Sequence, residues 1–194
     1  ITGGNLTLAG NEIKLAGAQL DAGGMNDGGT VHVGGLMHGA AGFSAQGIAL
    51  ANASNVMTNS ATTFKADGGI PSPTGGGLGW GNGGEIVLWS DQAMRFKGSI
   101  SAKGGALGGN GGMAEVSGLT SLGFGGLADL SATNGLNGTL LLDPRNITIV
   151  PGAGGLTSVA SPSVLELIDP TPGAGEGFGG SMTELANGNI VIAS

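Results

Sequence analysis

Short runs of alternating apolar and polar residues recur along the chain, and each run follows a pair of small residues. The runs are NLTL after Gly3-Gly4, TVHV after Gly28-Gly29, EIVL after Gly83-Gly84, MAEV after Gly111-Gly112, TLLL after Asn137-Gly138 and NIVI after Asn187-Gly188. Alternation with a period of two is typical of β-strands that bury one face. The second residues of these pairs are 25, 55, 28, 26 and 50 residues apart. If each long interval hides one degenerate copy, the spacing predicts about seven steps of about 26 residues, the period of a solenoid repeat.

A second strand pattern follows the first within several repeats. It consists of an apolar-x-apolar run, a small turn, another apolar-x-small run and a second small pair, and it occurs at residues 13–24, 94–105 and 122–135. Three short strands per repeat indicate an all-β fold. We predict a right-handed parallel β-helix, or β-solenoid, of about seven coils with glycine-rich corners and one or two extruded loops. Glycine is expected at these corners because it adopts positive φ angles without strain.

We expect the β-helix repeats to occupy residues 1–143, with one loop extruded near residues 68–84, where proline and glycine are too frequent for a strand. Proline lacks a backbone donor, so the Asp143-Pro144 pair interrupts the strand before it. Residues 144–194 are expected to continue the solenoid, with a Pro/Gly-rich irregular stretch near residues 151–180.

The alternation also predicts which side chains point into the solenoid. The inward candidates are Leu6, Leu8, Ile13, Leu15, Val31, Val33, Ile86, Leu88, Phe96, Ile100, Val116, Leu140, Leu142, Ile147 and Ile149. Strong helix formers never accumulate without a nearby glycine, so we expect helix only as a single turn within residues 163–168 or 181–186.

Composition favours an ordered fold and excludes several classes of function. The chain has 44 glycines and 7 prolines among 194 residues, a frequency typical of disorder, but its regular alternation and mean hydropathy of +0.25 favour an ordered core. Its net charge of −7, without a cationic cluster, argues against nucleic-acid binding. No apolar run is long enough for membrane insertion, and the absence of cysteine excludes disulfides and thiolate sites. The first residues begin in mid-pattern, as an excerpt of a longer protein would.

Several motifs resemble those of one known family. They are GNGGEIVLWSDQAMRFKGSISAKGG at residues 81–105, GNGGMAEVSG at residues 109–118 and GTLLLDPRNITI at residues 138–149. The order Trp-x-Asp, Arg-Phe-x-Gly-x-Ile-Ser-Ala-Lys-Gly-Gly, Glu-Val-Ser-Gly and Leu-Leu-Asp-Pro is similar to that of the large exoproteins of the filamentous haemagglutinin type. GGLMHGAAG at residues 34–42 and LANGNIVIAS at residues 185–194 also resemble segments of that family. The resemblance is weakest over residues 150–180.

The resemblance implies a right-handed β-helix and export by two-partner secretion to the surface of a Gram-negative or cyanobacterial cell or beyond it. The function it implies is a non-enzymatic shaft segment of a secreted or surface exoprotein, serving as an adhesin spacer or extracellular filament, including in biofilms. It also implies an outer-membrane translocator as a partner. Exposed sheet edges at the ends of the solenoid would in addition pair with adjoining β-helix coils of the same chain or with further copies stacked end to end. A host or matrix glycan is a further candidate partner.

The densest polar group in the sequence surrounds Trp89, Asp91 and Arg95. One interpretation makes Trp89 a stacking platform for a sugar, with Asp91 and Arg95 binding its hydroxyls; with Trp80 these residues would form a carbohydrate-binding module. The favoured interpretation is structural, in which Asp91 and Arg95 pair at a corner while Trp89 caps the edge of a coil. A third hypothesis is a polysaccharide-cleaving β-helix enzyme that uses Asp91.

We expect no catalytic residue, no cofactor and no metal ligand. The acidic residues lie in turns or alternating strands without an accompanying basic or aromatic cleft, whereas glycoside hydrolysis requires two carboxyl groups facing each other across a groove. The match of GWGNGG at residues 79–84 to a dinucleotide motif precedes a strand rather than a helix. Of the two histidines, His32 is expected on an outward strand face, where it contacts solvent rather than a metal.

Overall fold

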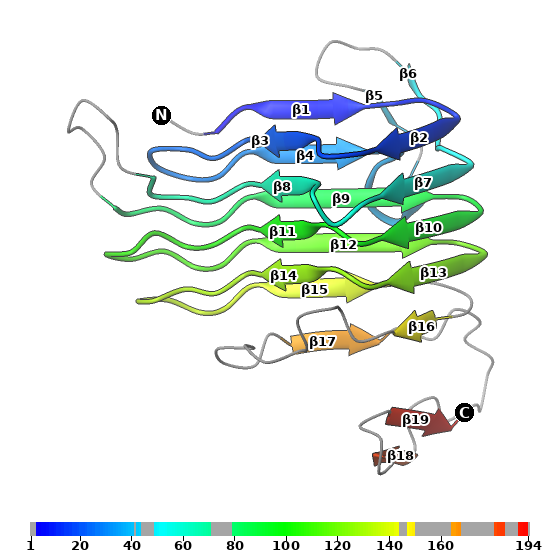
Figure 1. Ribbon diagram of the computed structural model, residues 1–194. Coiled ribbons are helices and arrows are strands. Elements are labelled where there is room, and N and C mark those ends of the chain that lie inside the picture. Colours follow the sequence, from blue (N-terminus) through cyan, green and yellow to red (C-terminus); the bar gives the residue numbers. More distant parts are fainter. Residues whose placement is uncertain are drawn as a thin grey trace.

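The protein folds as a stack of short β-strands (Figure 1). The computed structural model describes residues 3–40, 42–43, 49–70 and 79–143, together with the backbone of four strands at 147–149, 164–167, 181–184 and 190–193. Within these residues the one helix is a single 3₁₀ turn, η1 (Met37–Gly39). No helix in the described part of the chain has the length and apolar character needed to cross a membrane. The all-β class predicted from the sequence is therefore confirmed.

Three parallel sheets contain most of the strands. Sheet A contains β1 (Asn5–Leu8), β4 (Thr30–Val33), β9 (Glu85–Ser90), β12 (Met113–Gly118), β15 (Thr139–Leu142) and β17 (Val164–Leu167), in that order. Sheet B contains β2 (Glu12–Leu15), β7 (Asn55–Thr58), β10 (Ala93–Phe96), β13 (Ser121–Phe124) and β16 (Ile147–Ile149). Sheet C contains β3 (Gln19–Asp21), β8 (Thr63–Lys65), β11 (Ser99–Ser101) and β14 (Leu127–Asp129).

From β1 to β16 the chain visits the three sheets in the same order on each pass, from A to B to C and back to A. Each strand pairs with the strand one pass earlier and one pass later, so strands distant in sequence lie side by side (Figure 1). This arrangement is compatible with the predicted β-solenoid. It also fits the prediction of three short strands in each repeat.

The two long intervals between small-residue pairs have different explanations. β4 pairs directly with β9, Thr30 opposite Glu85, so no degenerate strand of sheet A lies within the interval of 55 residues and that expectation is wrong. The interval instead contains an insertion that follows β4. In the second interval β17 pairs with β15, Val164 opposite Thr139, so this hidden copy is confirmed.

The end of the chain differs from the prediction in two respects. The run NIVI, expected as a further repeat, contributes to β19 (Ile190–Ala193), which pairs antiparallel with β18 (Ser181–Glu184). The helical turn expected within residues 163–168 or 181–186 is also wrong, because β17 and β18 occupy these segments. The irregular stretch predicted near residues 151–180 lies largely outside the described residues.

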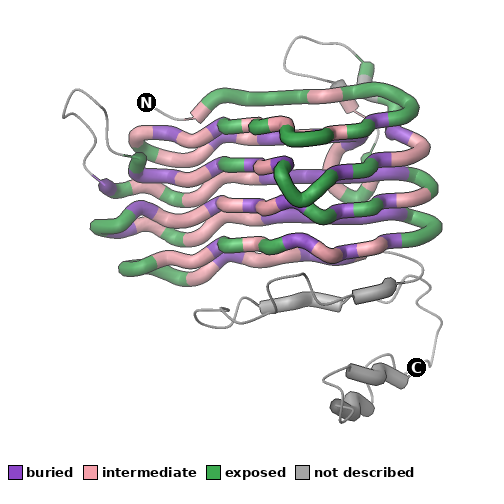
Figure 2. Tube along the Cα trace, viewed as in Figure 1, coloured by how far each residue is buried: buried purple, intermediate pink, exposed green. Residues whose placement is uncertain are grey.

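The interior is built from columns of apolar side chains that run along the stack. Buried positions accordingly recur on successive passes of the chain (Figure 2). Successive passes place similar residues opposite each other, because parallel strands in register stack equivalent positions. Three such columns are Val33-Leu88-Val116-Leu142, Ile13-Val56-Met94-Leu122 and Leu20-Phe64-Ile100-Ala128. The ring of Phe96 also packs between two others: its centroid lies 6.2 Å from that of Phe64 and 5.1 Å from that of Phe124.

Most of the predicted inward residues are buried, and the exceptions lie toward the ends of the stack. Leu8, Leu15 and Leu140 are partly buried and pack against the core, whereas Leu6 is 36% exposed because β1 is the outermost strand of sheet A. The side chains of Ile147 and Ile149 lie outside the described residues.

The small-residue pairs close each pass, and they do so by close approach rather than by positive φ. The amide of Gly112 donates to the carbonyl of Ala102 at 2.7 Å, and Gly29, Gly84 and Gly138 make the equivalent bond on their own passes. We call each such contact, between a small-residue pair and the backbone just after a strand of sheet C, a pinch. A Cβ on Gly111 would collide with the carbonyl of Leu130 and the amide of Gly138. None of these paired glycines has a positive φ, which occurs instead at other glycines such as Gly17 and Gly34. Our predicted role for glycine is therefore wrong at the pairs that the structure describes.

Beyond each pinch the chain extends into a glycine-rich arm that stacks on the arms of neighbouring passes (Figure 1). Side-chain oxygens link these arms: Asp27 Oδ1 accepts from the amide of Asn82 at 2.8 Å, and Asn82 Oδ1 accepts from the amide of Asn110 at 2.8 Å. In the loop predicted near residues 68–84, both flanks belong to this ladder, with Gly69 and Gly81 bonded to neighbouring passes. Residues 71–78 lie outside the described residues.

The pinch generates a direct test by substitution. Gly111→Ala should lower the free energy of unfolding by about 1–3 kcal/mol, because its new methyl group meets backbone that cannot move aside. Gly123→Ala, at a strand position where the added carbon makes only an ordinary contact, should change it by less than about 0.5 kcal/mol. Chemical denaturation of the two variants measures the difference, and equal stabilities would contradict steric closure.

Candidate functional site

An insertion that follows β4 departs from the repeat and covers part of the outer face of sheet A. It leaves at Gly34, whose φ is +77°, and returns where the amide of Ala53 donates to the carbonyl of Gly34 at 2.6 Å. Between these points it contains η1 and the short antiparallel strands β5 (Gly42–Phe43) and β6 (Ala49–Leu50). Because its two ends meet, the insertion does not shift the register of the sheets beneath it.

Trp89 anchors this insertion. Its side chain is only 5% exposed, and a Cβ on Gly35 or Gly39 would press against the indole ring, so two glycines of the insertion lie directly over it. The indole Nε1 donates to Asp91 Oδ1 at 2.9 Å. Asn52, at the other end of the insertion, donates to the same oxygen at 3.0 Å and to the carbonyl of Gly39 at 3.1 Å. GGLMHGAAG and the Trp-x-Asp motif are therefore parts of one packing unit.

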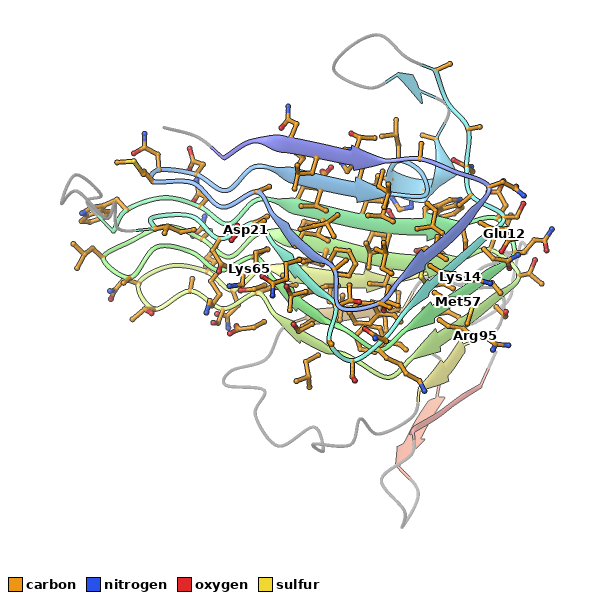
Figure 3. All side chains as sticks on the ribbon, turned by 45° about the horizontal axis from the view of Figure 1, so that its top comes forward. Glu12, Lys14, Asp21, Met57, Lys65 and Arg95 are labelled. Carbon is orange, nitrogen blue, oxygen red and sulfur yellow. The ribbon has the colours of Figure 1, made fainter. Side chains whose placement is uncertain are left out.

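The four site residues predicted from the sequence do not form one group. Trp89 and Asp91 are in contact, but Arg95 lies on the outer face of sheet B in a column with Lys14 and Met57 (Figure 3). Within the described residues no ion pair joins Asp91 to Arg95, so the predicted pairing at a corner is wrong.

Trp80 lies apart from the other three predicted residues. It precedes β9, whereas Trp89 is near the end of that strand, and it pairs with Gly108 on the adjacent pass. A Cβ on Gly108 would meet the ring of Trp80, and the side chain is 59% exposed. The two tryptophans therefore face different surroundings and do not line a common sugar-binding surface.

A cluster that our sequence reasoning missed lies under the same insertion. Glu115, on β12, points to the outer face of sheet A, yet its side chain has no exposed surface. Its two oxygens accept from the backbone amide of His38 at 3.2 and 3.0 Å, and Oε1 also accepts from the Ser117 hydroxyl at 2.9 Å. The His38 imidazole lies 4.0 Å from Glu115 Oε1 and 3.9 Å from Asp143 Oδ2. One imidazole and two carboxylates thus converge from three separate elements.

The environment of Glu115 shifts its titration. Burial raises the pKa of its carboxyl group, and the hydrogen bonds from His38 and Ser117 oppose this shift without overcoming it. Because both oxygens accept protein donors and neither reaches solvent, Glu115 is inaccessible to a polymer substrate. The cluster is suited to holding a proton or a small cation in place. These three residues are the ones in the described chain whose ligand atoms gather closely enough to hold a metal ion.

The sequence offered only a weak indication of this cluster. The alternation around Ala114 and Val116 places Glu115 outward, where an acidic residue ordinarily contacts solvent. Its burial depends on the path of the insertion, which no periodicity predicts. His38 is in turn the only described non-glycine residue with a positive φ, 54°, a conformation that its sequence context did not indicate.

A second polar contact crosses sheet A near the pinch. His32 Nε2 lies 2.7 Å from Glu85 Oε1, and this hydrogen bond, together with the charge of His32, lowers the pKa of the Glu85 carboxyl group. His32 therefore lies on the outward face as predicted, although it is a hydrogen-bond partner rather than a freely solvated side chain.

The lowered pKa of Glu85 predicts a pH-dependent contribution to stability. A carboxyl group whose pKa is depressed on folding contributes stability above its unfolded value of 4.5, and this contribution is lost as pH falls through the folded pKa. The difference in free energy of unfolding between the wild type and Glu85→Gln should therefore shrink from about pH 6 to about pH 3. Urea denaturation across this range measures it; a constant difference would contradict the prediction. High salt should weaken the effect, since Glu85 is partly exposed.

Comparison with known proteins gives no family for this chain. The chain matches no family model, no curated protein and no solved structure. The family resemblance of its motifs therefore remains an expectation from the residues themselves.

Proposed function

We propose that this chain is a segment of the non-enzymatic shaft of a large secreted or surface exoprotein of the filamentous haemagglutinin type, acting as an adhesin spacer or extracellular filament. The observation that carries the proposal is the regular passage of the chain through three parallel sheets, each strand bonded to its equivalent one pass away. Such a stack grows in one dimension by adding passes, as a spacer must.

The proposed winding is right-handed, because connections between parallel strands of one sheet overwhelmingly have this hand. We assign one proposed coil to each of the six strands of sheet A. This proposed number is one fewer than the spacing predicts, since the first long interval contains an insertion instead of a strand of sheet A. At a spacing of about 4.8 Å per coil, six coils extend about 29 Å along the axis.

Two features of the stack favour a mechanical role. The backbone hydrogen bonds between passes continue from the sheets through the glycine-rich arms, where Gly24, Gly68 and Gly104 each donate to the next pass. The low charge content, with 6 basic and 13 acidic residues, keeps repeated positions free of columns of like charge. A stack bonded in this way resists bending across its whole width.

The first strand of each parallel sheet, β1, β2 and β3, is paired on one side only within the described residues. A sheet edge of this kind accepts a further strand in register. This favours an adjoining coil of a longer chain, or a second copy stacked end to end, as the partner of the shaft.

A deletion of one whole coil tests the modular construction. Removal of residues 113–138 joins Gly112 to Thr139, so that β15 replaces β12 as the neighbour of β9 and leucines meet the core positions beneath them. The shortened protein should retain β-type circular dichroism and a cooperative melting transition. Removal of residues 113–125, about half a coil, should abolish both. It places β14, a strand of sheet C, directly after the pinch, where a strand of sheet A has to follow. Unfolding of both variants would contradict the proposed repeat.

The location and role of the protein are tested on cells that produce it. Antibodies raised against this segment should label intact cells or material they release. In cells whose protein lacks the segment, electron microscopy should show a shorter surface or released structure, and no enzymatic activity of the surface should be abolished. Labelling seen only after the cells are lysed would contradict a shaft outside the cell.

The two alternative functions, carbohydrate binding and polysaccharide cleavage, predict different results with the purified protein. Saturable binding of a glycan that is lost in Trp80→Ala would instead support a carbohydrate-binding module, since Trp80 is the exposed tryptophan. Release of reducing ends from a polysaccharide, lost in Asp91→Ala, would support the enzyme hypothesis.

A further inference from the structure

The cluster of His38, Glu115 and Asp143 has no role in the stacking of the shaft. His38 belongs to η1 in the insertion, Glu115 to β12, and Asp143 follows the end of β15. We propose that these three side chains bind a divalent transition-metal cation, Zn²⁺ in particular, and that the ion fastens the insertion to the outer face of sheet A.

The geometry of the cluster is close to that of a bound ion. All the ligand atoms lie within 4.8 Å of one another, and the two separations from the imidazole are 4.0 and 3.9 Å. Ligands about 2.1 Å from a tetrahedral zinc ion are about 3.4 Å apart. Closing the cluster around an ion therefore shortens the two imidazole separations by about 0.5–0.6 Å and the widest separation by up to about 1.4 Å.

The two outer ligands have the freedom to make this adjustment. The side chain of His38 is 54% exposed and that of Asp143 is 23% exposed, so both adjust without repacking the core. Glu115 is the fixed member, held by His38 and Ser117 with none of its surface exposed. An ion entering beside the two exposed side chains reaches a preplaced carboxylate.

The charge of the cluster favours a cation independently of its geometry. Two carboxylates lie close together, one of them fully buried, and their ion-pair partner among the described residues is His38 alone. Burial of a carboxylate is costly unless an opposite charge compensates it. A divalent ion supplies that charge, and the fourth coordination position, which the protein leaves free, would be filled by water.

The backbone conformation of His38 also helps to bring the three ligands together. Its φ of 54° and ψ of 25° place it in the left-handed region, which costs energy for a residue with a side chain. In this conformation its amide donates to Glu115 while its imidazole lies near Asp143, so His38 lies close to both carboxylates.

The donor set selects among ions. One imidazole nitrogen with two carboxylates suits zinc and its neighbours in the first transition row. Calcium prefers six to eight oxygen ligands and magnesium an octahedron of oxygens, neither of which this cluster provides. Zn²⁺ should therefore bind, and Ca²⁺ should not bind at the same concentration.

The test begins with the purified protein after treatment with a chelator. Titration calorimetry with Zn²⁺ should show one ion per chain, and Zn²⁺ should raise the melting temperature, because the ion binds the folded form. In the NMR spectrum, the ring nitrogens of His38 should shift on addition of Zn²⁺ while those of His32 do not.

Three variants and one control separate a site from adventitious binding. His38→Gly keeps the left-handed backbone and the amide that donates to Glu115 but removes the imidazole, while Glu115→Gln and Asp143→Asn remove the charge of one carboxylate with little change of shape. Each should weaken Zn²⁺ binding at least tenfold. His32→Ala removes the other described histidine, which pairs with Glu85, and should leave the affinity unchanged.

Several results would overturn the proposal: no saturable Zn²⁺ binding by the wild type, binding that His38→Gly leaves unchanged, or binding that His32→Ala abolishes. Equal affinity for Ca²⁺ and Zn²⁺ would also contradict it. None of these outcomes bears on the shaft, which depends on the three sheets alone, so the two proposals fail separately.

Discussion

The contact on which the rest of the structure depends is the meeting of two backbones at the small-residue pairs. There, the end of sheet C and the beginning of the next strand of sheet A approach closely enough for a direct hydrogen bond, such as that from Gly84 to the carbonyl of Ala66 at 2.7 Å. No side chain fits between them. This pinch sets the width of the interior and returns the chain to sheet A in register, so that each pass stacks on the one before it.

The register explains why the core can consist of simple columns. A Leu or Val that follows a pinch on one pass lies over the equivalent residue of the previous pass, as Leu88 lies over Val33. Changes of residue along a column are tolerated when their volumes compensate, which is how Ala114 lies between Ile86 and Leu140. The stack thereby accepts sequence variation without losing its regular spacing.

The outer face of sheet A shows how such a stack acquires other features. The insertion leaves after β4 and its ends are joined by the bond between Ala53 and Gly34, so β7 still pairs in register with β2. Because it covers Trp89 and Glu115, it creates a buried environment outside the main core. Chemistry that a regular stack cannot support, such as a buried carboxylate beside an imidazole, becomes possible there. A rigid shaft can therefore carry local sites without alteration of its length or register.

Local pattern by itself determined the strands, their apolar faces and the period of the repeat, because these depend on alternation within a few residues. It also indicated where glycine is required, although not why: the small pairs are needed for contact between backbones distant in sequence, and only the tertiary structure shows which carbonyl each glycine approaches. The path of the insertion is decided in the same way. A segment that leaves the repeat has no neighbour in register to define its position, so the burial of Trp89 and the meeting of His38, Glu115 and Asp143 follow from packing across passes and not from any spacing in the chain.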